Sequence, residues 1–202
     1  MELDANAWIT LAEAKAHLHI SISDSDCNEF ISQLINYGYK FLEGYIGRQA
    51  KSKEYTESYD GDDSNVLVLK KWPVISVASV HIDQDGERIF DSEALVDSDD
   101  YYVDTDPDTS IGQIELFQAT GTGPTWFSKG IKNIQVVYTA GWATVPYPLK
   151  FALQQLVAWH FRRSGTEATR QQSIGGFSKS YEDDNLPPHI KRFLDPYKNL
   201  YY

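Results

Sequence analysis

A block of short strand-like runs between two helical segments constrains the fold of this chain more than any other feature. Residues 52–142 hold runs of β-branched and aromatic residues, and turn-forming pairs such as Asp60-Gly61 and Ala140-Gly141 separate them. This pattern is typical of short antiparallel strands. We therefore predict an α+β fold in which residues 1–51 and 143–202 form a helical core. Residues 52–142 are predicted to form an inserted antiparallel β-sandwich or barrel-like domain, with strands at 66–69, 77–82, 101–103, 114–117 and 134–138.

The N-terminal segment predicts two helices. Thr10 and Glu13 have the spacing of a capping box, which opens a short helix over about residues 11–18. A longer helix is predicted to follow, with Asp26 and Glu29 as a second cap pair and Gly47 at its end. Its apolar residues recur at helical spacing, and this places Cys27 in the core.

The C-terminal segment predicts two further helices separated by a loop. Pro146 and Pro148 suit the first turn of a helix that continues to about Ser164. Residues 165–185 are polar and lack periodicity, so they predict a long loop, which includes the glycine-containing stretch 173–177. A short helix is predicted to begin near Pro187.

Charge and composition exclude several classes of protein. The 202 residues carry 18 Lys plus Arg and 29 Asp plus Glu, a formal charge of −11. Between Glu54 and Ser128 there are 17 acidic residues against three basic ones, so the β block carries most of the negative charge. A protein that binds nucleic acid through its phosphates needs an excess of Lys and Arg, which this chain lacks. No run approaches the roughly 20 apolar residues of a membrane span, so no membrane partner is expected.

The residues that could carry catalysis do not form a recognisable pattern. Carboxylate pairs such as Asp62-Asp63 and Asp99-Asp100 lie in turn-like sequence, and the five histidines are scattered over all three blocks. Metal sites and acid–base catalysis need such groups to converge, which adjacency in the sequence does not provide. We expect no catalytic residue, no metal and no cofactor, and the protein is not predicted to be an enzyme.

Two features point to binding. Aromatic and basic residues gather in the C-terminal segment, which would either fold back on the core or dock on another chain, because large aromatic side chains are costly to leave exposed. The second feature is the set of tryptophans Trp72, Trp126 and Trp142. They suggest an alternative function, that of a carbohydrate-binding or hydrolytic β module. Trp72 and Trp142 flank proline-containing segments and can simply pack there.

The order of the segments resembles a known family. The run Ile9-Thr-Leu-Ala-Glu-Ala-Lys-Ala-His-Leu18, then Asp24-Ser-Asp26 and the helix end Glu43-Gly-Tyr-Ile-Gly-Arg48, is similar to the N-terminal signature of bacteriophage head–tail connector (adaptor) proteins. Val136-Val-Tyr-Thr-Ala-Gly-Trp142 with Val145-Pro146 is similar to a second signature, and residues 187–197 are similar to the closing element. The smallest family members are nearly all helical, so the β block is a departure.

The resemblance implies a virion structural protein of the portal-attached, ring-forming type. Such a protein forms a homo-oligomeric ring, normally of twelve copies, at the head–tail interface, and it is assembled in the host cytoplasm. The ring contacts the portal and a stopper or tail-terminator protein, and packaged DNA passes through it without sequence-specific binding. A tail-completion or minor capsid protein is the alternative within this class.

The resemblance also implies two sets of site residues. The portal-binding set is Lys191, Arg192, Phe193, Tyr197, Tyr201 and Tyr202. The set that contacts a stopper or lines the channel is Arg170, Ile174, Phe177 and Lys179. Cutting the chain at residue 186 is expected to remove portal attachment and to leave the fold intact.

Overall fold

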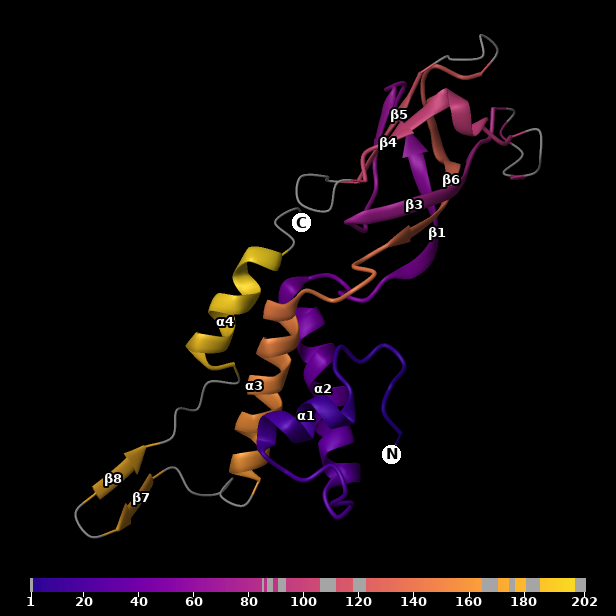
Figure 1. The fold of residues 1–202 in the computed structure, drawn as a ribbon. Coiled ribbons are helices and arrows are strands. Elements are labelled where there is room, and N and C mark those ends of the chain that lie inside the picture. The colour runs from indigo at the N-terminus through magenta and orange to yellow at the C-terminus, as the bar shows by residue number, and fades with distance from the viewer. Residues whose placement is uncertain are drawn as a thin grey trace. The chain divides into compact units, whose positions relative to one another are not determined.

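A computed structural model describes residues 2–84, 86, 89–90, 94–105, 112–117, 123–164, 171–174, 177–180 and 186–198. For 171–174 and 177–180 it describes the backbone alone. The chain divides into two compact units, Met1–Ala50 with Val145–Tyr202, and Lys51–Thr144. The first unit holds the helices and the second holds two small sheets (Figure 1). We call them the helical unit and the β unit. The α+β prediction is therefore confirmed.

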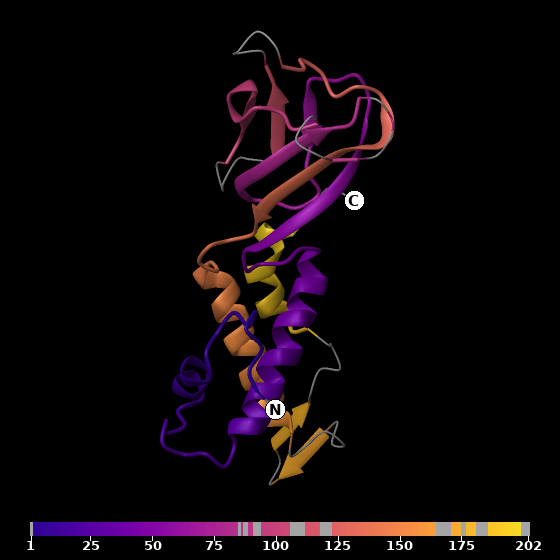
Figure 2. The same cartoon turned by 90° about the vertical axis from the view of Figure 1, so that its right-hand side faces the viewer.

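The described part of the helical unit contains four α-helices. They are α1 (Leu11–Leu18), α2 (Asn28–Ile46), α3 (Tyr147–Arg163) and α4 (Pro188–Leu194), the last followed by the 3-10 turn η2 (Asp195–Tyr197). Helix α3 packs against both α2 and α4 (Figures 1 and 2). Fully buried aliphatic side chains fill the space between the helices, as helical periodicity requires. They include Ile31, Ile35, Leu42, Leu149, Leu153, Leu156 and Ile190.

The start of α1 follows the predicted capping box. Thr10 Oγ1 accepts from Glu13 N at 3.2 Å, and Thr10 N donates to Glu13 Oε2 at 2.6 Å. Both orphan amides of the helix start are thus satisfied. Lys15, which is only 2% exposed, donates from Nζ to the carbonyl oxygens of Ile22 and Asp24. A buried ammonium is stable there because it is hydrogen-bonded, and it orders the turn that leads to α2.

The start of α2 differs from the prediction. The N-cap residue is Cys27, and its side chain makes no capping hydrogen bond. Asp26 instead donates its backbone N–H to Asp24 Oδ1 in a local turn, so the predicted Asp26–Glu29 cap pair is wrong. Cys27 is half-buried at the helix end rather than in the core. The end of α2 is as predicted, because Gly47 takes the left-handed conformation with φ 73° that glycine permits.

The polar segment between α3 and α4 contains a hairpin that the sequence analysis missed. Strands β7 (Gln171–Ile174) and β8 (Phe177–Ser180) pair antiparallel. The prediction of a loop through 173–177 is therefore wrong. The physical reason is that Gly175-Gly176 separates the strands in the sequence, and short hairpin connections favour glycine.

The β unit contains two three-stranded antiparallel sheets. One has the order β1 (Lys53–Gly61), β6 (Gly130–Ala140), β3 (Val74–Ile82), and the other has the order β2 (Val66–Val68), β5 (Gln113–Leu116), β4 (Tyr101–Val103). Residues of both sheets share one buried core, as in a sandwich. Its members include Tyr59, Leu67, Val80, Ile114, Leu116, Ile134, Val136 and Tyr138.

Candidate assembly surfaces

The predicted portal-binding residues lie mostly on α4 and η2, against the helical unit. Arg192 is exposed, whereas Lys191 and Tyr197 are half-buried. Phe193 is also half-buried, and its ring lies edge-on to Phe151 of α3 with centroids 5.3 Å apart. Tyr201 and Tyr202 lie outside the described residues. Of the two alternatives left open by the sequence, folding back on the core is therefore what residues 186–198 do.

A set of polar contacts ties the end of α4 to α2. Arg48 donates from Nε to the backbone oxygen of Tyr197 at 2.7 Å, and Tyr45 donates from its hydroxyl to Asp195 Oδ1 at 2.9 Å. Lys198 Nζ lies 4.0 Å from the centroid of the Tyr45 ring and 3.4 Å from Asp195 Oδ1. We call these five residues the C-terminal clip. Burial lowers the pKa of Arg48 to about 10, so its guanidinium is charged at neutral pH.

The buried apolar side of α4 changes the effect that is expected when the chain is cut at residue 186. Leu186, Ile190 and Leu194 are 4%, 0% and 0% exposed. Removing the chain from residue 186 onward would expose the core that they cover, at a cost of about 2–5 kcal/mol for each large aliphatic side chain lost. We therefore expect such a cut to destabilise the helical unit, in contrast to the expectation from the sequence that it leaves the fold intact.

Phe193 belongs to an aromatic cluster that extends across three helices. Phe151 contacts Tyr147 with ring centroids 6.1 Å apart and His17 of α1 with centroids 5.9 Å apart. Tyr147 is 73% exposed, so it is the accessible edge of the cluster. We call His17, Tyr147, Phe151 and Phe193 the Phe151 cluster. Sequence reasoning missed Tyr147 and Phe151, although their spacing of four places both on one side of α3.

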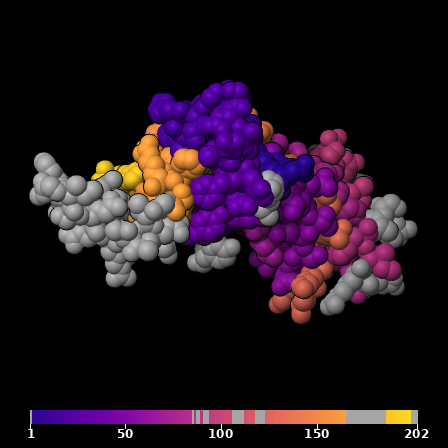
Figure 3. All heavy atoms as spheres, turned by 90° about the horizontal axis from the view of Figure 1, so that it is seen from below, coloured from indigo at the N-terminus to yellow at the C-terminus, as the bar shows by residue number. Residues whose placement is uncertain are grey.

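A second aromatic cluster lies where α2 meets α3. Tyr37 stacks on Phe41 with centroids 5.8 Å apart and meets His160 edge-on at 5.7 Å, and Phe30 lies 5.9 Å from Phe161. Tyr37 is 53% exposed and Phe30 is 38% exposed. In the space-filling view, atoms of α2 and α3 lie next to each other on the surface of the helical unit (Figure 3). Large aromatic side chains are enriched in protein–protein interfaces relative to the rest of the protein surface.

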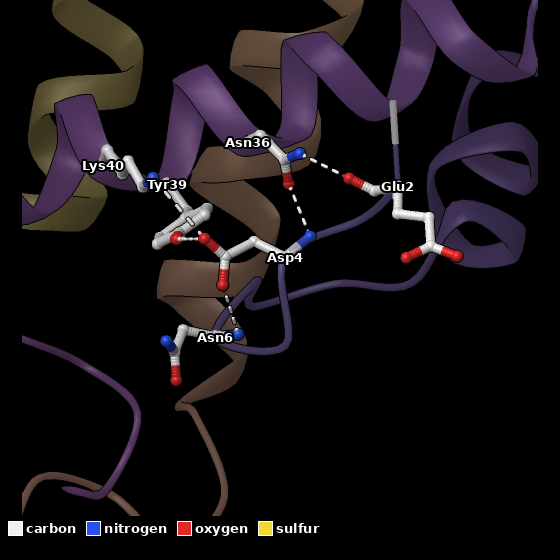
Figure 4. A network of polar contacts seen from close by, with 6 residues as sticks. All are labelled: Glu2, Asp4, Asn6, Asn36, Tyr39 and Lys40. Atoms are coloured by element: carbon white, nitrogen blue, oxygen red, sulfur yellow. Dashed lines mark hydrogen bonds and ion pairs between the residues drawn. The ribbon is translucent and has the colours of Figure 1, made fainter.

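A polar network anchors the N-terminal segment to the same helix, α2 (Figure 4). Asp4 N donates to Asn36 Oδ1 at 2.9 Å, and Asn36 Nδ2 donates to the backbone oxygen of Glu2 at 2.9 Å. Tyr39 donates to Asp4 Oδ2 at 2.5 Å, and Lys40 Nζ lies 3.5 Å from the same oxygen. The hydrogen bond from Tyr39 lowers the pKa of Asp4, so its carboxylate remains charged and holds the segment in place.

The β unit contains a buried polar network but no converging site for chemistry among its described residues. Glu57 Oε2 accepts hydrogen bonds from Tyr59 and Tyr138, each at 2.6 Å. The two hydroxyls also accept from the backbone N–H groups of Lys70 and Lys71, at 3.1 and 3.2 Å. Burial, followed by the bond to Glu57, raises the pKa of both tyrosines. The network therefore fixes the 70–71 backbone on the sheet.

The tryptophans behind the carbohydrate alternative differ in accessibility. Trp126 is 58% exposed, whereas Trp72 and Trp142 are half-buried. Within the described ranges, no three His, Cys, Asp or Glu side chains are grouped so as to hold a metal ion. No helix of those ranges is long and apolar enough to cross a membrane.

Three of the predicted stopper or channel residues fall on the hairpin. Ile174 ends β7, Phe177 begins β8, and Lys179 lies within β8. Arg170 lies outside the described residues. The structure thus places three of the four on one supersecondary element, in a segment that was predicted as a loop.

The fold and these surfaces define an α+β structural protein whose exposed aromatic side chains are suited to packing against other proteins. A family model described as "HCP: Head completion protein" matches residues 7–200. The chain therefore belongs to the head completion protein family, and it is a virion structural protein of that type. This confirms the resemblance to phage head–tail connectors.

Two solved structures share the fold along the whole chain. One is a chain from the neck of an empty gene transfer agent (GTA) particle computed with C6 symmetry, with 15% identity and a TM-score of 0.58, covering 100% of this chain and 95% of that one. The other comes from the virion of a native GTA particle, with 14% identity and a TM-score of 0.61, covering 100% and 94%. A search of curated proteins finds no significant match.

Proposed function

We propose that this chain is a neck adaptor of a phage-like particle, which forms a ring between the portal and the tail. The observation that carries the proposal is the likeness of its fold, over the whole chain, to a chain of a GTA neck. The head completion family, by its description, adds a role in completing the head. Six-fold symmetry in that GTA neck is compatible with twelve copies here, because twelve is a multiple of six.

The helical unit is the part proposed to bind the portal. The Phe151 cluster offers Tyr147 as an exposed anchor, and Arg192 on α4 is exposed as well. Large aromatic residues and arginines are both enriched among interface hot spots. Lys191, Phe193 and Tyr197 would support this surface through the folded α4 and the C-terminal clip, and Tyr201 and Tyr202 would extend it.

The β unit and the hairpin are proposed to serve the other functions of the ring. The β unit carries 17 acidic and 7 basic residues, and a ring of negative units around a channel repels DNA phosphate. Packaged DNA would then slide through without sequence-specific binding. Arg170, Ile174, Phe177 and Lys179 would contact the stopper or line the channel.

The test is assembly on the portal ring from the same source, measured by light scattering. The wild-type chain of 23.0 kDa is expected to add the mass of about a dozen copies. Tyr147→Ala combined with Arg192→Glu should abolish or strongly reduce this increase, because these changes remove exposed groups and leave the buried side of α4 intact. Tyr102→Ala, at a residue of the β unit that is 59% exposed, is the matched control and should assemble normally.

Three outcomes separate the possibilities. No mass increase with the wild-type chain would contradict the portal-attached ring and favour the tail-completion or minor capsid alternative. Normal assembly of the double variant would retain the ring and refute this portal surface. Loss of assembly by Tyr102→Ala alone would move the portal contact to the β unit.

A further inference from the structure

The β7–β8 hairpin pairs only with itself among the described strands. Its register joins Gln171 to Ser180, Gln172 to Lys179, Ser173 to Ser178 and Ile174 to Phe177. A two-stranded hairpin alone is marginally stable in water, because each strand leaves a row of backbone N–H and C=O groups without a strand to pair with. Strands that pair with both outer edges would therefore stabilise the hairpin.

The register determines which backbone groups face those edges. Ile174 and Phe177 flank a two-residue connection, so they form a hydrogen-bonded pair within the hairpin. Antiparallel pairs alternate in type, so Gln172 and Lys179 also bond to each other. The N–H and C=O groups of the remaining positions point outward. Those positions are Gln171 and Ser173 on β7, and Ser178 and Ser180 on β8.

We propose that the hairpins of neighbouring copies pair edge to edge in the ring, β8 of one copy with β7 of the next, and close into a β-barrel. The inference rests on the proposed ring. Rotation about a ring axis preserves strand direction, so β8 meets the next β7 antiparallel, as it meets its own β7. A ring also supplies a neighbour for both edges of every hairpin, and closure leaves no edge open.

The size of such a barrel is reasonable. A dozen copies would contribute roughly 24 strands, and barrels of about 16 strands or more already enclose a water-filled channel. The strands read Gln-Gln-Ser-Ile and Phe-Ser-Lys-Ser, so most of their residues are polar. A mostly polar barrel is suited to an aqueous channel, and its cohesion would come from backbone hydrogen bonds between copies.

Proline substitution at an outward-facing position tests the pairing. Ser178→Pro removes one outward N–H and keeps the bonds within the hairpin, because proline is tolerated where a strand's N–H is unpaired. Ser178→Ala keeps the N–H and is the matched control. Amide hydrogen exchange of residues 171–180 is measured by mass spectrometry in the full-length chain, first alone and then assembled on the portal ring.

In the wild-type chain and Ser178→Ala, the outward amides of Gln171, Ser173 and Ser180 should exchange at least tenfold more slowly in the ring than in the free chain. Ser178→Pro should lose most of this added protection. A second measurement uses rings assembled in a Cys27→Ser background from equal amounts of Ser173→Cys and Ser178→Cys chains. Oxidation should yield disulfide-linked heterodimers, which free chains at the same concentration do not form.

The alternatives give different results. A complete ring whose outward amides exchange as fast as in the free chain would overturn the barrel and leave the adaptor function standing. Protection that appears only after the next neck protein is added would assign the hairpin edges to that protein instead. Absence of any ring with the wild-type chain would overturn both proposals.

Discussion

Arg48 and Tyr197 are 149 positions apart in the sequence, yet a hydrogen bond of 2.7 Å joins Arg48 Nε to the backbone oxygen of Tyr197. Arg48 directly follows the end of α2, and it is 8% exposed. The bond therefore fixes the last described turn of the chain against the C-terminal end of α2. The tail proposed to bind the portal is held by its own chain before any partner arrives.

Replacing Arg48 tests how far this bond holds the tail. Arg48→Ala should lower the free energy of unfolding by about 1.5–3 kcal/mol, the range for a hydrogen bond to a charged group. Amide exchange at residues 195–198 should rise at the same time. Lys40→Ala is the control, because the Lys40 side chain is 64% exposed and its ion pair with Asp4 is worth at most about 1 kcal/mol. Equal losses in urea unfolding would contradict a special role for Arg48.

The close packing of α2 on α3 depends on Gly38. A Cβ at Gly38 would lie 2.7 Å from Cδ1 of the fully buried Leu153, whereas a Cβ at Gly44 would meet nothing within 4 Å. Gly38→Val should therefore cost about 1–3 kcal/mol through overpacking. Gly44→Val makes the same change on the same helix and should stay within about 0.5 kcal/mol of the wild type. Thermal unfolding followed by circular dichroism measures both, and similar melting temperatures would refute the close approach.

The tyrosine pair of the β unit gives a third test. Tyr138→Phe removes a donor to Glu57 and the acceptor for the Lys71 amide, both in a largely buried setting. The expected loss is about 1–3 kcal/mol, because the groups left behind lose their partner away from water. Tyr102→Phe, at an exposed residue, should change stability by less than about 0.5 kcal/mol. An equal loss for Tyr102→Phe would show that the hydrogen bonds of Tyr138 do not stabilise the fold more than those of an exposed tyrosine.

Much of the secondary structure could be predicted because its signals are local. The capping box at Thr10 and the Gly47 helix end each depend on residues within one or two turns. Strand β1 was missed because Lys53–Gly61 alternates tyrosines with charged and hydroxyl residues, and the burial of Tyr59 depends on partners in other strands. The hairpin strands were missed for a related reason, since Gln and Ser carry weak strand preference.

The candidate surfaces were only partly predictable. Aromatic and basic residues in the tail indicated a binding segment, and Phe193 is indeed part of an aromatic cluster. Its partner Phe151 lies on α3, and pairing between distant elements leaves no periodic trace in one sequence. The same holds for Arg48 and Tyr197, because neither residue type nor local spacing reveals a contact made across the whole chain.

The Phe151 cluster should make stability depend on pH through His17. Burial lowers the pKa of His17, and the positive charges of Arg162 and His19 add to this effect. Below its unfolded pKa of about 6.5, the unfolded chain therefore binds the proton more readily than the folded chain does. The contribution of neutral His17 to the free energy of unfolding is complete above that pH and is lost as the pH falls.

His17→Phe should therefore lose less stability than the wild type between pH 7.5 and pH 5.5. His189→Gln, at an exposed histidine outside the Phe151 cluster, is the control variant. Glu43 acts in the opposite direction, because burial raises its pKa and the folded chain gains stability relative to the unfolded chain as the pH falls. We therefore compare the free energy of unfolding of each variant, measured in urea, with that of the wild type at each pH. The Glu43 contribution cancels in this difference. A difference for His17→Phe that does not change with pH would show that the imidazole is free to protonate within the cluster.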